Sequence, residues 1–166
     1  MVRNDQGVAF RYARTTRNKI RQGVSMIGQR SELLKYRADI HPYGCYMMSL
    51  VMLAWEFMDA SESITSEEII DFYDWAREHD YMGKHCYIKN PQAMVDYFCP
   101  DRLEFKGKED GGYPVKKDQR AIQLWILNRS KGGISKHFCY GSFDPWPRSQ
   151  TKRFGSIDSI RLFEVL

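Results

Sequence analysis

One long apolar segment constrains the fold of this chain more than any other feature. The run from Cys45 to Met58 follows a stretch with Pro and Gly, Ile40 to Gly44, which the sequence predicts to be a turn. The run is too long for a typical strand, lacks alternation, and is rich in Met and Leu. A helix that is apolar on nearly every side is buried in a globular protein. The sequence therefore predicts a central buried helix, too short to cross a bilayer and interrupted by Ser49 and Glu56.

Other elements follow from start signals and alternation. Thr65-Ser66-Glu67-Glu68 is a capping box that opens an acidic amphipathic helix through about Glu78. Asn90-Pro91 is an N-cap followed by a first-turn proline, before a short helix over Ala93 to Phe98. Four strands are predicted after Pro100: Arg102 to Phe105, Ala121 to Leu127, His137 to Tyr140 and Ile157 to Val165. This order predicts an α+β domain with a mostly antiparallel sheet packed on the central helix.

The charge distribution divides the chain into an arm and one domain. The 166 residues are 43% hydrophobic and 14% aromatic, enough for a real core, which excludes global disorder. Residues 1–37 hold nine Lys or Arg and two acidic residues, a net charge of +7, whereas residues 38–166 carry −3. The basic arm could attract nucleic acid or an acidic partner. Because it has no nucleic-acid-binding motif, a solvated arm folded against the acidic remainder is the favoured interpretation.

The cysteines and the first residues indicate the compartment. Cys45, Cys86, Cys99 and Cys139 are widely spaced, with no Cys-x-x-Cys, so free thiols in a reducing compartment are expected. His85-Cys86 is the nearest approach to a pair of metal ligands, and it is too isolated to predict a metal or another cofactor. The sequence starts without a basic and then apolar leader, so a cytoplasmic protein without membrane association is expected.

Cys45 is the first candidate for chemistry. At the start of a buried helix, the helix dipole and free backbone N–H groups stabilise a thiolate, which is a nucleophile. The alternative is a small buried cysteine that happens to begin an apolar helix.

A second candidate lies between His137 and Trp146. Gly141-Ser142 divides two short strand-like pieces and predicts a two-residue hairpin loop that pairs Tyr140 with Phe143. By parity His137, Asp144 and Trp146 then share one face, and the Asp144 carboxylate lies diagonally from the imidazole. A carboxylate on one ring nitrogen fixes the tautomer and frees the other nitrogen for a thiol.

These segments resemble the papain-like cysteine peptidases. The matching pieces are Tyr43-Gly44-Cys45-Tyr46-Met47-Met48-Ser49-Leu50, His137-Phe138 and Asp144-Pro145, and they are most similar to the compact branch around bacteriocin-processing (double-glycine) peptidases. The run from Gly44 to Ala54, with Asn90-Pro91, is also similar to small papain-like proteins carried by phages and plasmids. The resemblance implies a papain-like fold over residues 38–166. It also implies Cys45 as nucleophile, His137 as general base and acid, and Asp144 as the residue that orients His137.

The sequence departs from that family at the oxyanion position. The family places a Gln about six residues before the cysteine, and here that position is Asp39. A carboxylate has no hydrogen to donate, so Asp39 cannot donate a hydrogen bond to an oxyanion. Gln29, His41 and Tyr43 are the substitute donors considered. The resemblance therefore implies either a peptidase or amide hydrolase, or an inactive papain-like fold that binds a protein such as a host factor of a phage. Tyr140, Phe143 and Trp146 are expected to be exposed aromatic residues near the cleft.

Overall fold

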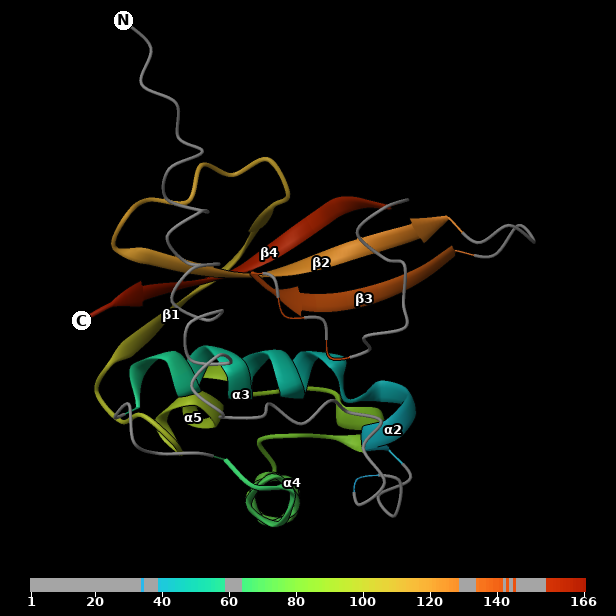
Figure 1. Cartoon of the computed structure of the whole chain (residues 1–166), viewed down its shortest axis with the longest axis vertical. Coiled ribbons are helices and arrows are strands. Elements are labelled where there is room, and N and C mark those ends of the chain that lie inside the picture. Colours follow the sequence, from blue (N-terminus) through green and yellow to red (C-terminus); the bar gives the residue numbers. More distant parts are fainter. Residues whose placement is uncertain are drawn as a thin grey trace, which may run out of the picture.

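Helices precede strands in the computed structural model, as the sequence predicts, and the helices lie on one side of the sheet (Figure 1). The structure describes residues 34, 39–58, 64–128, 134–141, 143, 145 and 155–166. The proposed arm, residues 1–37, lies outside this part of the chain except for Leu34. No helix in these ranges is long and apolar enough to cross a membrane.

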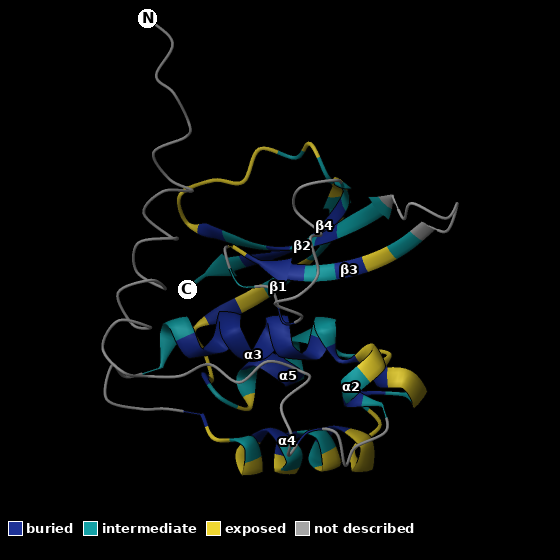
Figure 2. Cartoon of the chain, turned by 45° about the vertical axis from the view of Figure 1, so that its right-hand side comes forward, coloured by how far each residue is buried: buried dark blue, intermediate teal, exposed yellow. Residues whose placement is uncertain are grey.

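The predicted central helix is α3, which spans Cys45–Phe57. Every residue from Leu50 to Trp55 is at most 1% exposed. Figure 2 shows α3 almost wholly buried, with the sheet on one side and α4 (Ser66–Glu78) and α5 (Pro91–Asp96) on the other. Because both sides of the helix are covered, no side of it faces solvent, which explains why its sequence has no polar stripe.

The predicted turn before α3 is wrong, because Ile40–Tyr43 forms a short helix, α2. Pro42 lies in its first turn, where a backbone N–H has no helical partner to lose, so proline is tolerated there. Gly44 separates α2 from α3 and donates from its N–H to the Ile40 carbonyl oxygen at 2.9 Å. A Cβ on residue 44 would lie 2.5 Å from that same oxygen, so the junction requires glycine.

The two capped helices are confirmed. Helix α4 spans Ser66–Glu78, and both hydrogen bonds of its capping box join Thr65 and Glu68. Helix α5 spans Pro91–Asp96, and the Asn90 side chain accepts a hydrogen bond from the Ala93 N–H at 3.0 Å. Between them lies a single 3-10 turn, η2 (Lys84–Cys86), which the sequence pattern does not reveal.

The four predicted strands form one antiparallel sheet in the order β1-β4-β2-β3. Their bounds are Leu103–Asp110, Gln119–Asn128, Ile134–Tyr140 and Gly155–Val165, for β1 to β4 respectively. Strand β1 continues beyond the predicted end at Phe105. The residues that follow Phe105 are mostly polar, yet they still pair with β4.

The connection from β1 to β2 must cross the sheet. Both strands are antiparallel to β4, which lies between them, so they run parallel to each other and residues 111–118 pass over β4. Figure 1 shows this connection on the side of the sheet away from the helices. The sheet is therefore covered by α3 on one face and, over β4, by this loop on the other.

Candidate functional site

Cys45 is the first residue of α3, as predicted, with Gly44 as its N-cap. Of the four cysteines, all of which the structure describes, Cys45 alone is partly exposed, while Cys86, Cys99 and Cys139 are buried. The Ser49 hydroxyl donates to the Cys45 carbonyl oxygen at 2.8 Å, one turn into the helix. Cys45 therefore lies at a helix start and is more exposed than the other three cysteines.

The hairpin that follows His137 is confirmed. The Tyr140 N–H donates to the Phe143 carbonyl oxygen at 3.1 Å, and the Phe143 N–H donates back to Tyr140 at 2.8 Å. Gly141 has a φ of 57°, in the left-handed region that a two-residue hairpin loop requires and glycine adopts without strain. Asp144 and Trp146 lie outside the described residues, so their places opposite β3 stay predictions.

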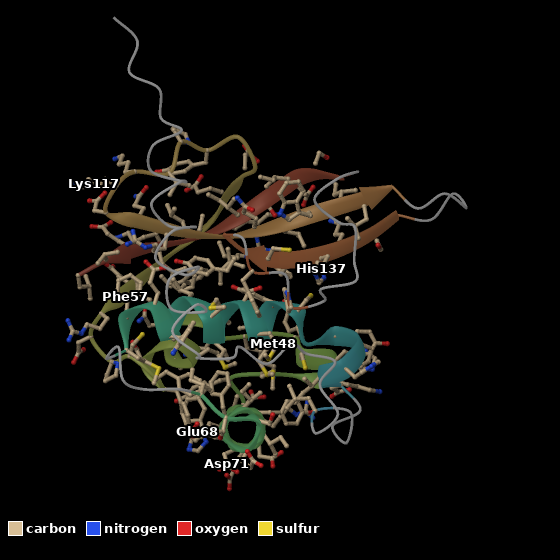
Figure 3. The ribbon with its side chains drawn as sticks, in the orientation of Figure 1. Met48, Phe57, Glu68, Asp71, Lys117 and His137 are labelled. Atoms are coloured by element: carbon tan, nitrogen blue, oxygen red, sulfur yellow. The ribbon has the colours of Figure 1, made fainter. Side chains whose placement is uncertain are left out.

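Strand β3 passes over the start of α3 (Figure 3). The rings of Tyr46 and Phe138 stack at 4.3 Å between centroids, with planes 16° apart. The Arg161 guanidinium on β4 lies over both rings, at 5.9 Å from Tyr46 and 5.4 Å from Phe138. Since these two aromatic residues directly follow Cys45 and His137, the segments carrying the candidate nucleophile and base are in contact.

Alternation along β3, however, presents other side chains to the helix. Tyr140 donates from its hydroxyl to the Glu56 carboxylate on α3, and Phe138 stacks on Tyr46. Successive side chains of a strand point to opposite faces, so His137 and Cys139 point to the face away from α3. His137 is only 4% exposed there. The structure thus brings the backbone of His137 near the start of α3, but its strand position directs the imidazole to the other face.

The expected cleft aromatics are corrected where the structure describes them. Tyr140 is 5% exposed, and burial together with the neighbouring Glu56 carboxylate raises its pKa. Phe143 is half-buried and packs against the core. Both side chains cover the core, because the hairpin turns them toward the helical layer.

The oxyanion candidates have other contacts. Asp39 accepts a hydrogen bond from the Tyr73 hydroxyl at 3.0 Å and precedes α2 as its N-cap residue. Tyr43 on α2 is 47% exposed, and its ring stacks on His85 at 4.4 Å. His41 is half-buried on the same helix, and Gln29 lies outside the described residues.

Sequence reasoning missed a group of titratable side chains that interact electrostatically with one another and include Cys45. We call it the thiol cluster: Cys45, Cys86, Asp39 and Tyr73. Burial, the Asp39 carboxylate and the Cys45 thiol raise the pKa of Cys86 to about 12. Burial and the hydrogen bond to Asp39 raise the pKa of Tyr73 to about 12, with a smaller contribution from Cys86. The only sequence signal was the isolated His85-Cys86 pair, and no group of three or more His, Cys, Asp or Glu in the described ranges is arranged to hold a metal.

No protein-family model matches the chain, and no curated protein or solved structure matches it significantly. The structure is α+β with an antiparallel sheet, a class that many unrelated activities share. The fold class therefore does not define the activity of the chain.

Proposed function

We propose that the chain is a papain-like cysteine hydrolase that cleaves a peptide amide with Cys45 as its nucleophile. One observation carries the proposal: Tyr46 and Phe138, which follow Cys45 and His137, stack at 4.3 Å at the start of a buried helix. The partial exposure of Cys45, beside three buried cysteines, supports it as well.

In the proposed reaction the Cys45 thiolate attacks the carbonyl carbon of the substrate. His137 accepts the thiol proton and returns it to the leaving amine, and water then hydrolyses the acyl-enzyme. Asp144 orients the imidazole, and the Cys45 backbone N–H helps to stabilise the oxyanion. For this chemistry the His137 ring has to reach the α3 side of β3, which is the terminal strand in the order of the described sheet.

The test is the rate of Cys45 alkylation by iodoacetamide between pH 5 and 9, followed by mass spectrometry. We expect Cys45 to react faster than a cysteine in an unstructured peptide near neutral pH, because an imidazole that holds the thiol proton increases the thiolate population. His137→Ala should return the rate to that of the peptide. Cys139→Ser is the matched control, since it changes the same face of the same strand without removing the base.

A peptide-based acylating probe supplies the second readout. A covalent adduct on Cys45 that is lost in His137→Ala supports catalysis. If wild type and His137→Ala alkylate at the rate of the free peptide and the probe leaves no adduct, Cys45 is not a catalytic nucleophile.

A second function is favoured by the alternation on β3. Because Phe138 and Tyr140 rather than His137 meet α3, the same scaffold could bind a protein partner without turnover. Two exposed aromatic residues fit this role: Tyr43 on α2 is 47% exposed, and Tyr87, which follows η2, is 70% exposed. In that case Cys45→Ser retains full binding, whereas Tyr43→Ala together with Tyr87→Ala abolishes it.

A further inference from the structure

The outer edges of the two terminal strands of the sheet, β1 and β3, differ in what covers them (Figure 1). Such an edge presents backbone N–H and C=O groups that no neighbouring strand pairs. At β1 the side chain of Gln92 on α5 bonds to these groups. Its Nε2 donates to the Leu103 carbonyl oxygen at 2.8 Å, and its Oε1 accepts from the Phe105 N–H at 2.7 Å. The Gln92 amide thus takes the place of a peptide group in a neighbouring strand.

At β3 the hairpin shows which backbone groups point to the outer edge. Tyr140 exchanges both of its backbone hydrogen bonds with Phe143, so its N–H and C=O point away from β2. In an antiparallel pair, the backbone groups of successive residues point to opposite sides of the strand. Those of Phe138 and Lys136 therefore point outward, like those of Tyr140, whereas those of His137 point to β2.

The segment that returns from the hairpin lacks the donors to cover this edge as a strand. Continuing the register of the hairpin pair places Pro145 opposite Phe138 and Pro147 opposite Lys136. Proline has no N–H to donate, and Pro145 lies in a bend rather than in a strand. Among the described residues, the hairpin bridge is the only pairing on this side of β3. We call the outward backbone groups of Lys136 and Phe138 the open edge.

We propose that the open edge binds an extended segment of a partner protein, which adds a strand to the sheet and places an acidic side chain opposite Lys136. The outward N–H and C=O groups fit a peptide backbone in the extended conformation, the mode of recognition called β-augmentation. This surface is separate from Tyr43 and Tyr87, and the proposal does not depend on Cys45 as a nucleophile.

The side chain of Lys136 selects the charge of the partner. It is 57% exposed, and its ammonium group lies 3.6 Å from the Asp158 carboxylate, a surface pair that contributes little to stability. Opposite charges on facing residues of paired strands attract each other, whereas like charges repel. A second copy of the chain is a poorer occupant, because two-fold pairing centred on Lys136 would set two lysines opposite each other.

Two neighbouring proline variants test the direction of the backbone groups. Lys136→Pro removes an N–H that points outward, so we expect its unfolding midpoint in urea to stay close to that of the wild type. Ser135→Pro removes an N–H that points to β2, where Leu127 is its partner, and we expect a clearly lower midpoint. Equal losses in the two variants would place the Lys136 N–H on the β2 side and overturn the proposal.

Amide hydrogen exchange of the full wild-type chain, followed by NMR, tests binding. The probe is the peptide acetyl-Thr-Val-Thr-Glu-Thr-Val-Thr-amide at millimolar concentration, and the control peptide has Lys in place of Glu. We expect the Glu peptide to slow the exchange of the Lys136 and Phe138 amides, and the Lys peptide to bind about 3–10-fold more weakly. Lys136→Glu should reverse this preference.

The wild-type exchange data decide the proposal even if a proline variant folds poorly. Slow exchange of both amides in dilute protein without peptide would show that the edge is already covered. Slow exchange that develops only as the protein concentration rises would identify a second copy as the occupant. Either result, an absence of protection by the Glu peptide, or an unchanged preference in Lys136→Glu overturns the proposal.

Discussion

At the scale of single residues, Glu56 connects the central helix to two strands. Its carboxylate accepts a hydrogen bond from the Arg120 guanidinium on β2 at 3.0 Å and another from the Tyr140 hydroxyl on β3. The Glu56 and Arg120 side chains are only 12% and 15% exposed. Buried charges are tolerated when they are paired and hydrogen-bonded, so this group explains why an otherwise apolar helix contains a glutamate.

Tyr140→Phe should therefore destabilise the fold without altering its shape. The substitution removes one donor from a buried carboxylate, and we expect the free energy of unfolding to fall by about 1–3 kcal/mol. Urea denaturation followed by circular dichroism measures the change. Tyr87→Phe is the matched control, because Tyr87 is 70% exposed and should show almost no effect. An equal midpoint for the two variants would show that the Tyr140 hydroxyl contributes nothing to stability.

At the scale of elements, helix starts are fixed by local hydrogen bonds. The Thr65 hydroxyl accepts from the Glu68 N–H at 3.2 Å, and the Glu68 carboxylate accepts from the Thr65 N–H at 2.7 Å. These two bonds satisfy backbone donors that no helical carbonyl can reach. The junction between α2 and α3 has no such side-chain cap, and it depends instead on the missing Cβ of Gly44.

Removing the α4 cap should cost stability in proportion to one lost hydrogen bond. We expect Thr65→Ala to lower the free energy of unfolding by about 1 kcal/mol, within the usual range of 0.5–2 kcal/mol for such caps. Thr65→Ser retains the hydroxyl and should stay close to wild type. Thermal unfolding of the three proteins side by side gives the comparison, and equal loss in Ser and Ala would assign the effect to the threonine methyl group instead.

At the scale of the whole molecule, the crossing from β1 to β2 brings a loop against the sheet. A Cβ on residue 111 would lie 2.1 Å from the Ile157 carbonyl oxygen, so the backbone of this loop touches β4 directly. At the neighbouring Gly112 a Cβ would meet nothing within 4 Å. The two adjacent glycines therefore differ in purpose: the first permits close packing, while the second borders open space.

Gly111→Ala and Gly112→Ala test this packing as a matched pair. We expect Gly111→Ala to lower the free energy of unfolding by about 1–3 kcal/mol, because backbone has to move to admit the methyl group. Gly112→Ala should change it by no more than about 0.5 kcal/mol, as at other open surface positions. Equal unfolding midpoints in urea would contradict the close contact between Gly111 and the Ile157 carbonyl group.

Features that depend on residues close together in the chain were predictable from the sequence. The span of α3, the caps at Thr65 and Asn90, and the Gly141 hairpin were predictable because their signals are steric or hydrogen-bonding effects between residues close in the chain. The short helix α2 was missed because Pro and Gly favour a turn, although the first turn of a helix also accommodates proline.

Which surfaces meet depends on packing between segments that are distant in the chain. Alternation on β3 defines two faces, but the sequence does not say which one packs on α3, and contacts with Tyr46 and Glu56 select Phe138 and Tyr140 over His137. In the same way, packing between distant segments stacks the His85 ring on Tyr43, a contact that no local pattern records. The physical reason is that burial depends on total apolar area and shape, which are properties of the assembled layers, whereas caps and hairpins depend on a few adjacent backbone groups.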